Sequence, residues 1–86
     1  MRERYSDKIY VSVVALTRPD GSVIPLQLIW PDGRQWEIDR VLDVRPGVAR
    51  KAGGEGMRYL CRISGQQREL WCSQGQWFVE GEDFKD

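Results

Sequence analysis

The sequence contains no histidine and only two cysteines, Cys61 and Cys72, among its 86 residues. Two cysteines at this spacing are too few for a disulfide scaffold, and without histidine they cannot complete a four-ligand zinc site. The lack of histidine also removes the usual base for a serine or cysteine nucleophile, and no serine stands in a glycine-framed elbow. We therefore expect a reduced, buried pair of cysteines in a protein that is not an enzyme and holds no metal or cofactor.

Long apolar runs and an excess of one charge are absent as well. No segment approaches the roughly 18 uninterrupted apolar residues of a membrane-spanning helix, and the start of the chain lacks the apolar run of a signal peptide. We therefore predict a cytoplasmic protein without membrane contact. Basic and acidic residues number 13 each, so any attraction to nucleic acid must come from a local patch. The length suits one domain, placed at 8–80 between a flexible arm at 1–7 and a flexible acidic tail at 81–86.

Two Pro-Asp-Gly triplets, at 19–21 and 31–33, bracket a β-rich stretch in the first half of the chain. Proline presets the second position of a type I turn, and glycine accepts the positive φ that closes a three-residue hairpin loop. The triplets therefore predict two hairpins that share the strand at 23–30. Residues 8–17, rich in β-branched side chains, form the preceding strand.

Counting outward from these loops predicts which residues of the first two strands face the core. The predicted inward set is Tyr10, Ser12, Val14, Leu16, Ile24, Leu26, Leu28 and Trp30. The opposite face is also apolar, since it carries Ile9, Val11, Val13, Ala15, Val23 and Ile29. Apolar side chains on both faces indicate a strand pair that curls into a barrel or meets a partner chain. We favour the barrel, and the alternative is a homodimer joined through Val11, Val13 and Ile29.

The third strand, at 35–44, alternates with Trp36, Ile38, Leu42 and Val44 facing inward, and Arg40 interrupts this series. Arg40 then lies either at an edge, where its side chain reaches water, or in a cleft. Residues 45–56, with four glycines and a proline, predict a long loop. Shorter strands follow at 57–64, 67–73 and 77–80. The predicted fold is all-β, a small antiparallel SH3-like barrel or meander of five or six strands.

Basic residues concentrate in and around the predicted loop. Small β-barrels hold single-stranded nucleic acid with arginines on phosphates and aromatic rings on bases. The candidate ligand-binding residues on this hypothesis are Arg45, Arg50, Lys51, Arg58, Arg62, Trp30 and Trp71. Tryptophans in so small a domain are more often part of the core. We therefore favour a non-catalytic protein-interaction or accessory module with a protein partner, and keep nucleic-acid binding through 45–56 as the alternative.

The hairpin Trp30-x-Asp32-Gly33-Arg34-x-Trp36-x-Ile38-Asp39, followed by segments 59–63, 70–72 and 77–79, resembles a family of short uncharacterised bacterial β domains. The resemblance covers roughly residues 8–80 and lies mostly in core and turn positions. It implies a bacterial cytosolic β protein with a closing C-terminal meander, and it carries over no catalytic residue.

Overall fold

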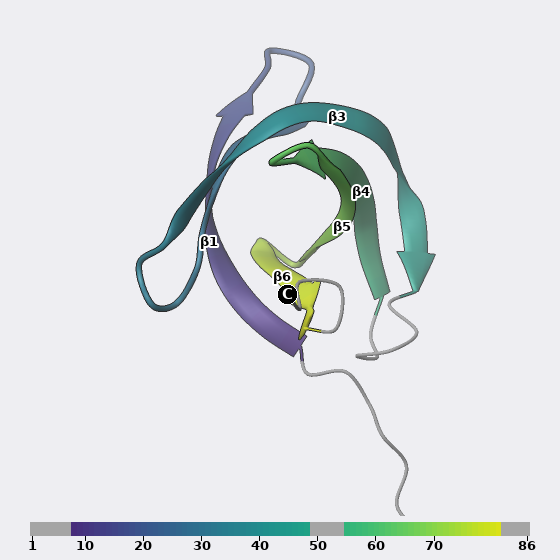
Figure 1. Ribbon diagram of the computed structural model, residues 1–86. Coiled ribbons are helices and arrows are strands. Elements are labelled where there is room, and N and C mark those ends of the chain that lie inside the picture. Colours follow the sequence, from purple (N-terminus) through teal and green to yellow (C-terminus); the bar gives the residue numbers. More distant parts are fainter. Residues whose placement is uncertain (1–7, 49–54, 82–86) are drawn as a thin grey trace, which may run out of the picture.

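A computed structural model describes residues 8–48 and 55–81 of the chain. These residues form six strands and no α-helix: β1 (Lys8–Thr17), β2 (Val23–Ile29), β3 (Gln35–Val48), β4 (Glu55–Ile63), β5 (Gln66–Ser73) and β6 (Gln76–Glu80). Each strand pairs antiparallel with the next, and β6 pairs back with β1 to close a barrel (Figure 1). This confirms the prediction of a small all-β barrel. The predicted flexible arm at 1–7 and all of the predicted tail except Gly81 lie outside the described residues.

No helix among the described residues is long and apolar enough to cross a membrane.

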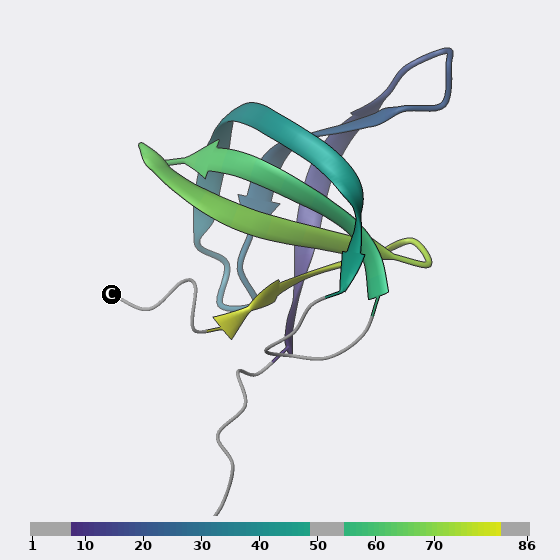
Figure 2. The ribbon, with the colours of Figure 1, turned by 90° about the vertical axis from the view of Figure 1, so that its right-hand side faces the viewer.

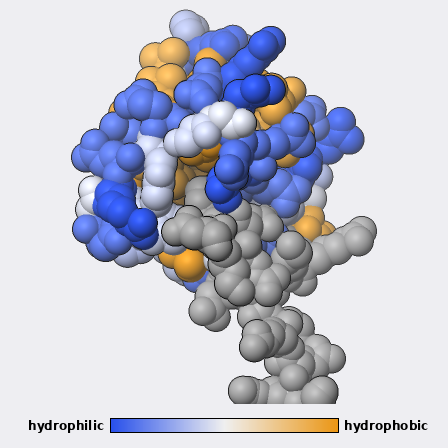
Figure 3. Space-filling model, in the orientation of Figure 1, coloured by the Kyte–Doolittle hydropathy of each residue, from blue (hydrophilic) through white to orange (hydrophobic). Residues whose placement is uncertain are grey.

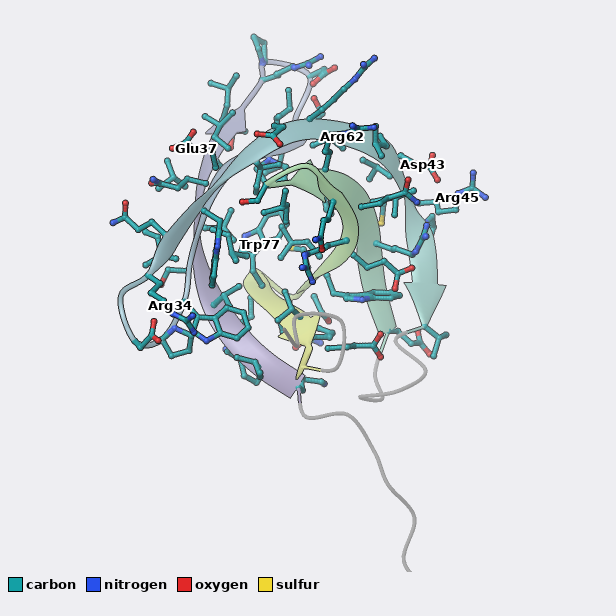
Figure 4. All side chains as sticks on the ribbon, viewed as in Figure 1. Arg34, Glu37, Asp43, Arg45, Arg62 and Trp77 are labelled. Atoms are coloured by element: carbon teal, nitrogen blue, oxygen red, sulfur yellow. The ribbon has the colours of Figure 1, made fainter. Side chains whose placement is uncertain are left out.

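The barrel encloses one main core of side chains that are almost fully buried. These are Leu28, Ile38, Tyr59, Cys61, Ile63, Leu70 and Val79. Trp77 of β6 packs against this cluster and points into the barrel (Figure 4). Most of the apolar stabilisation of the domain therefore comes from β3 to β6 and from the middle of β2.

The two Pro-Asp-Gly loops form as predicted. Around the first loop, the amide of Arg18 donates to the carbonyl of Ser22 at 2.8 Å, and Gly21 has a φ of 89°. The second loop repeats this geometry, because the amide of Trp30 donates to the carbonyl of Arg34 at 2.8 Å. Both are three-residue loops.

The predicted inward face of β1 is wrong, because β2 contains a bulge. Leu16 pairs with Ile24 as expected, but Val14 pairs with Gln27, so that Leu26 is an extra residue in β2. One extra residue moves the rest of the strand to the opposite face, since side chains alternate with a period of two. Val14 is therefore 47% exposed and Leu16 is 51% exposed.

The candidate dimer interface is wrong for two of its three residues. Val11 and Val13 are partly buried and pack against the main core, so they do not form an outer face. Ile29 pairs with Ser12 on the outer side and is half-buried. The bulge in β2 is the physical cause, because it places the apolar set Ile9, Val11 and Val13 inside.

β3 carries two further irregularities, at Asp39 and Leu42, where its register against β4 shifts. They bend the strand over the barrel, as Figure 1 shows. The first bulge turns Arg40 outward and places Val41 against the core, which explains why Arg40 interrupts the sequence pattern. Leu42 and Val44, predicted to be inside, are 37% and 42% exposed.

The long loop predicted at 45–56 is wrong at both ends, and its middle, 49–54, lies outside the described residues. β3 continues to Val48 and β4 begins at Glu55, with Gly47 paired to Gly56. A Cβ atom on Gly56 would lie 2.5 Å from the carbonyl oxygen of Cys72, so this glycine permits a close approach of strands rather than a turn.

Two-residue turns connect the last three strands. Ser64 and Gln74 occupy left-handed conformations, both with φ of 52°, and each is followed by a glycine with positive φ. Cys72 consequently pairs with Met57 and Cys61 with Arg68, and both thiols are free.

Candidate functional site

The predicted basic surface is largely neutralised by neighbouring carboxylates. Arg45 and Arg58 are cross-strand partners on β3 and β4. Arg45 Nε lies 2.7 Å from Asp43 Oδ2, and Arg58 Nε lies 2.5 Å from Glu69 Oε2. Asp43 also approaches Arg58 Nη1 at 4.0 Å. Charges paired in this way attract phosphate weakly. Of the remaining candidates, Arg50 and Lys51 lie outside the described residues.

Arg62 is the candidate basic residue that the structure leaves most available. It is exposed and pairs across the strands with Arg40. Neither arginine forms an ion pair with a residue of 8–48 or 55–81. Figure 4 shows Arg62 apart from the Asp43–Arg45 pair, so the structure does not gather the basic candidates into one patch.

The two candidate tryptophans do not offer open faces for base stacking. Trp71 is 2% exposed and stacks on Phe78 with ring centroids 6.2 Å apart and planes 9° from parallel. Its Nε1 donor is buried and has no acceptor in the described part of the chain. Trp30 is half-buried and meets Trp36 edge to face at 5.4 Å.

The seam between β2 and β3 is held by one of the two shortest strand pairings of the barrel; the other joins β5 and β6. Only Gln27, Leu28 and Ile29 of β2 pair with β3. Beyond this point, over residues 14–26, β2 pairs only with β1, and the tip of their hairpin extends away from the other strands (Figure 2), while Pro25 is fully buried. We call these residues the projecting hairpin. At this seam, two strand edges have no strand neighbour among the described residues: Val23–Leu26 on β2, and the residues of β3 from Ile38 onward.

A cleft of about 660 Å³ lies between these two edges. β2 contributes Val23 and Ile24 to one side, while β3 and β4 contribute the other. The apolar lining residues are Val23, Ile24, Val41, Val44, Met57 and Tyr59, with Arg18, Gly21 and Ser22 at the hairpin end. We call this site the seam cleft. Sequence analysis missed it, although the surplus of apolar residues on both faces of the first strands was a signal of it.

Tyr59 gives the seam cleft a polar group beneath its apolar walls. The side chain is 7% exposed, and its ring packs on Trp77 with centroids 5.0 Å apart. Its hydroxyl makes no hydrogen bond with a described residue. Burial raises the pKa of this hydroxyl, with smaller contributions from the Cys72 and Cys61 thiols. The hydroxyl therefore stays protonated at neutral pH and is able to donate a hydrogen bond.

A second, more open hollow of about 840 Å³ is lined by Pro46, Gly47, Gly56, Met57 and Cys72, among others. Its lining includes Val48 and Glu55, the last described residue before 49–54 and the first one after it. The walls of the seam cleft, in contrast, are all described.

Reactive groups are scarce around the cleft. Burial raises the pKa of the Cys61 thiol to about 11 and also raises that of Cys72, which lowers the thiolate content of both. Within 8–48 and 55–81, no three potential metal ligands come together. The arrangement is suited to recognition of an apolar ligand rather than to nucleophilic chemistry.

Comparison with known proteins gives no match, whether with protein-family models, with curated proteins or with solved structures. The resemblance to short bacterial β domains stays a prediction.

Proposed function

We propose that this protein is a non-catalytic protein-interaction module that binds an extended segment of a partner protein in the seam cleft. The observation that carries this proposal is the open seam, where two unpaired strand edges flank an apolar cleft. An extended peptide that enters the seam adds a strand to the sheet, so its backbone amides and carbonyls pair with the free edges.

The lining residues suit alternate side chains of such a peptide. In an extended chain every second side chain points the same way, so apolar residues at i and i+2 enter the cleft together. Burial of their surface against Val23, Val41 and Val44 contributes about 25 cal/mol per Å². The Tyr59 hydroxyl supplies a hydrogen-bond donor for a peptide carbonyl or polar side chain. Backbone pairing thus provides affinity, and the cleft provides the preference for apolar residues.

The proposal is tested by selecting binders from a phage-displayed library of random peptides of about eight residues, the length of an ordinary strand with short flanks. We expect selected sequences with apolar residues at every second position. Calorimetric titration of the selected peptide should then show at least tenfold weaker binding to Val44→Asp, a loss of about 1.4 kcal/mol or more.

Leu42→Asp is the matched control for Val44→Asp. Both residues lie on β3 and are exposed to a similar extent, 37% for Leu42 and 42% for Val44, but only Val44 lines the seam cleft. Leu42→Asp should bind the peptide as the wild type does. Equal binding by Val44→Asp and the wild type, with both folded by circular dichroism, would refute the proposal. Equal losses of binding in the two variants would also refute the proposal, because they would place the peptide elsewhere on β3.

A further inference from the structure

The outer face of the projecting hairpin carries large apolar side chains that the barrel does not cover. Val14 is 47% exposed, Leu16 is 51% exposed and Leu26 is 44% exposed. Leu16 pairs directly with Ile24, and Leu26 forms the bulge opposite Val14, so these side chains adjoin one another across the two strands. Apolar (orange) surface is visible near the top of Figure 3, beside the hydrophilic tip of this hairpin. A contiguous apolar patch on a monomer of this size indicates an interaction surface.

This patch is distinct from the seam cleft, because Val14, Leu16 and Leu26 do not line the cleft, although Arg18 at the hairpin tip does. Ile24 lies between the two surfaces, paired with Leu16 and also lining the cleft. A peptide bound in the cleft therefore leaves Val14, Leu16 and Leu26 exposed. A separate partner is needed to cover them.

Charged groups stand at the two ends of the patch with opposite sign. Arg18, at the tip, lies two residues after Leu16 and just beyond the end of β1, and its guanidinium makes no ion pair with a described residue. Glu37, at the base, is exposed and accepts a hydrogen bond from Gln27 Nε2 at 3.3 Å. Asp20 also lies at the tip, where hydrogen bonds from Ser22 and the charge of Arg18 lower the pKa of its carboxyl group. Arg18 and Glu37 nevertheless place opposite charges at the two ends of the patch.

We propose that two copies of this chain form a dimer by packing the outer faces of their projecting hairpins against each other in antiparallel orientation. A two-fold axis through the patch brings the tip of each hairpin to the base of the other, so Arg18 of each copy faces Glu37 of its mate. Val14, Leu16 and Leu26 then form a shared apolar layer between two aligned sheets. The chain carries no net charge, so two copies approach without overall repulsion.

Sedimentation equilibrium over a wide dilution series tests this dimer. The wild type should show a monomer–dimer equilibrium, and Leu16→Asp should be monomeric throughout the series. Val48→Asp is the matched control, because Val48 is 56% exposed on β3 and lies outside the patch. It should dimerise as the wild type does. A wild type that stays monomeric at the highest concentration, or a dimer that Leu16→Asp leaves intact, would overturn the proposal.

A charge exchange tests the antiparallel orientation. Arg18→Glu and Glu37→Arg each place like charges opposite one another, so each should weaken the dimer several-fold. The double variant restores opposite charges at both contacts and should regain most of the affinity. Dimerisation of the double variant no stronger than that of the weaker single variant would contradict the orientation.

Titration of Leu16→Asp with the phage-selected peptide separates this proposal from the proposed function. A monomeric Leu16→Asp that binds the peptide normally shows the two surfaces to be independent, as we expect. If the wild type dimerises but no peptide is selected, the proposed function fails and the dimer stands. If a peptide binds but no dimer forms, the dimer proposal fails and the proposed function stands.

Discussion

Cys61 has no exposed surface, and its burial has a consequence for stability at alkaline pH. Burial raises the pKa of the folded thiol to about 11, from an ordinary value of 9.0. Between these pH values the unfolded chain loses the thiol proton while the folded chain retains it. Proton loss favours the unfolded state, so the contribution of Cys61 to stability is complete below pH 9 and is lost as the pH rises toward 11.

We expect the free energy of unfolding of the wild type to fall more steeply above pH 9 than that of Cys61→Ala. The difference between the two pH dependences should be on the order of 2 kcal/mol near pH 11. Urea unfolding of both proteins at a series of pH values measures it. Because every other titrating group is common to both proteins, parallel curves would show that Cys61 is not the source.

Individual residue types carry different amounts of information about the fold. Gly21 and Gly33 are recognisable from sequence because proline and aspartate precede them in the pattern of a known turn. Gly47 and Gly56 are predicted to lie in a loop, because glycine is common in loops. Both lie in strands, and the role of Gly56, its close approach to the backbone at Cys72, depends on atoms far away in the sequence, so no local pattern contains it.

At the scale of strands, bulges decide which face of the hairpin is buried. Period-two counting predicted the Leu16–Ile24 pair and failed one step further, at Leu26. Nothing in a single strand shows that one residue is unpaired, since the bulge depends on how two strands twist together. In β3, by contrast, Arg40 was a local signal of the irregularity at Asp39, because a charged side chain stood where the alternation required an apolar one.

The turn between β4 and β5 makes a prediction at this same scale. Ser64 has a φ of 52° and is followed by Gly65 at 79°. Asparagine tolerates this left-handed conformation better than serine, and Asn-Gly is the favoured pair in such turns. Ser64→Asn should therefore raise the free energy of unfolding by a few tenths to about 1 kcal/mol in urea unfolding.

Ser12→Asn is the control for the turn, because Ser12 is exposed in the middle of β1 and has no positive φ. It should leave stability unchanged or lower it slightly, since asparagine is disfavoured in strands. Equal stabilisation by both substitutions would show that the effect does not come from the turn.

Across the whole molecule, the charge concentrated between Arg40 and Arg62 in the sequence is not concentrated in space. β3 and β4 place Asp43 and Glu69 beside Arg45 and Arg58, so neighbouring charges cancel. Basic residues are concentrated in one part of the sequence, but the pairing of strands places acidic residues beside them. The all-β barrel itself was predictable, because turn signals and β-branched runs are local features.

The seam cleft belongs to the whole molecule as well. It exists because β2 separates from β3 beyond Gln27, and that separation follows from the curvature of two neighbouring strands rather than from any motif. The same separation exposes the projecting hairpin and its outer apolar face. One geometric feature thus creates both surfaces, the cleft that we propose binds an extended peptide and the face that we propose packs against a second copy of the chain.

Amide hydrogen exchange, resolved by residue and measured with and without the phage-selected peptide, tests the open seam most directly. In the free protein, we expect rapid exchange at those amides of Val23, Ile24 and Leu26, and of the non-proline residues of β3 beyond Ile38, that point away from β1 and β4. Saturation with peptide should slow these amides and leave those of the β4–β5 pairing unchanged. Edge amides that are already protected in the free protein, or that exchange equally fast with peptide bound, would contradict strand addition at the seam.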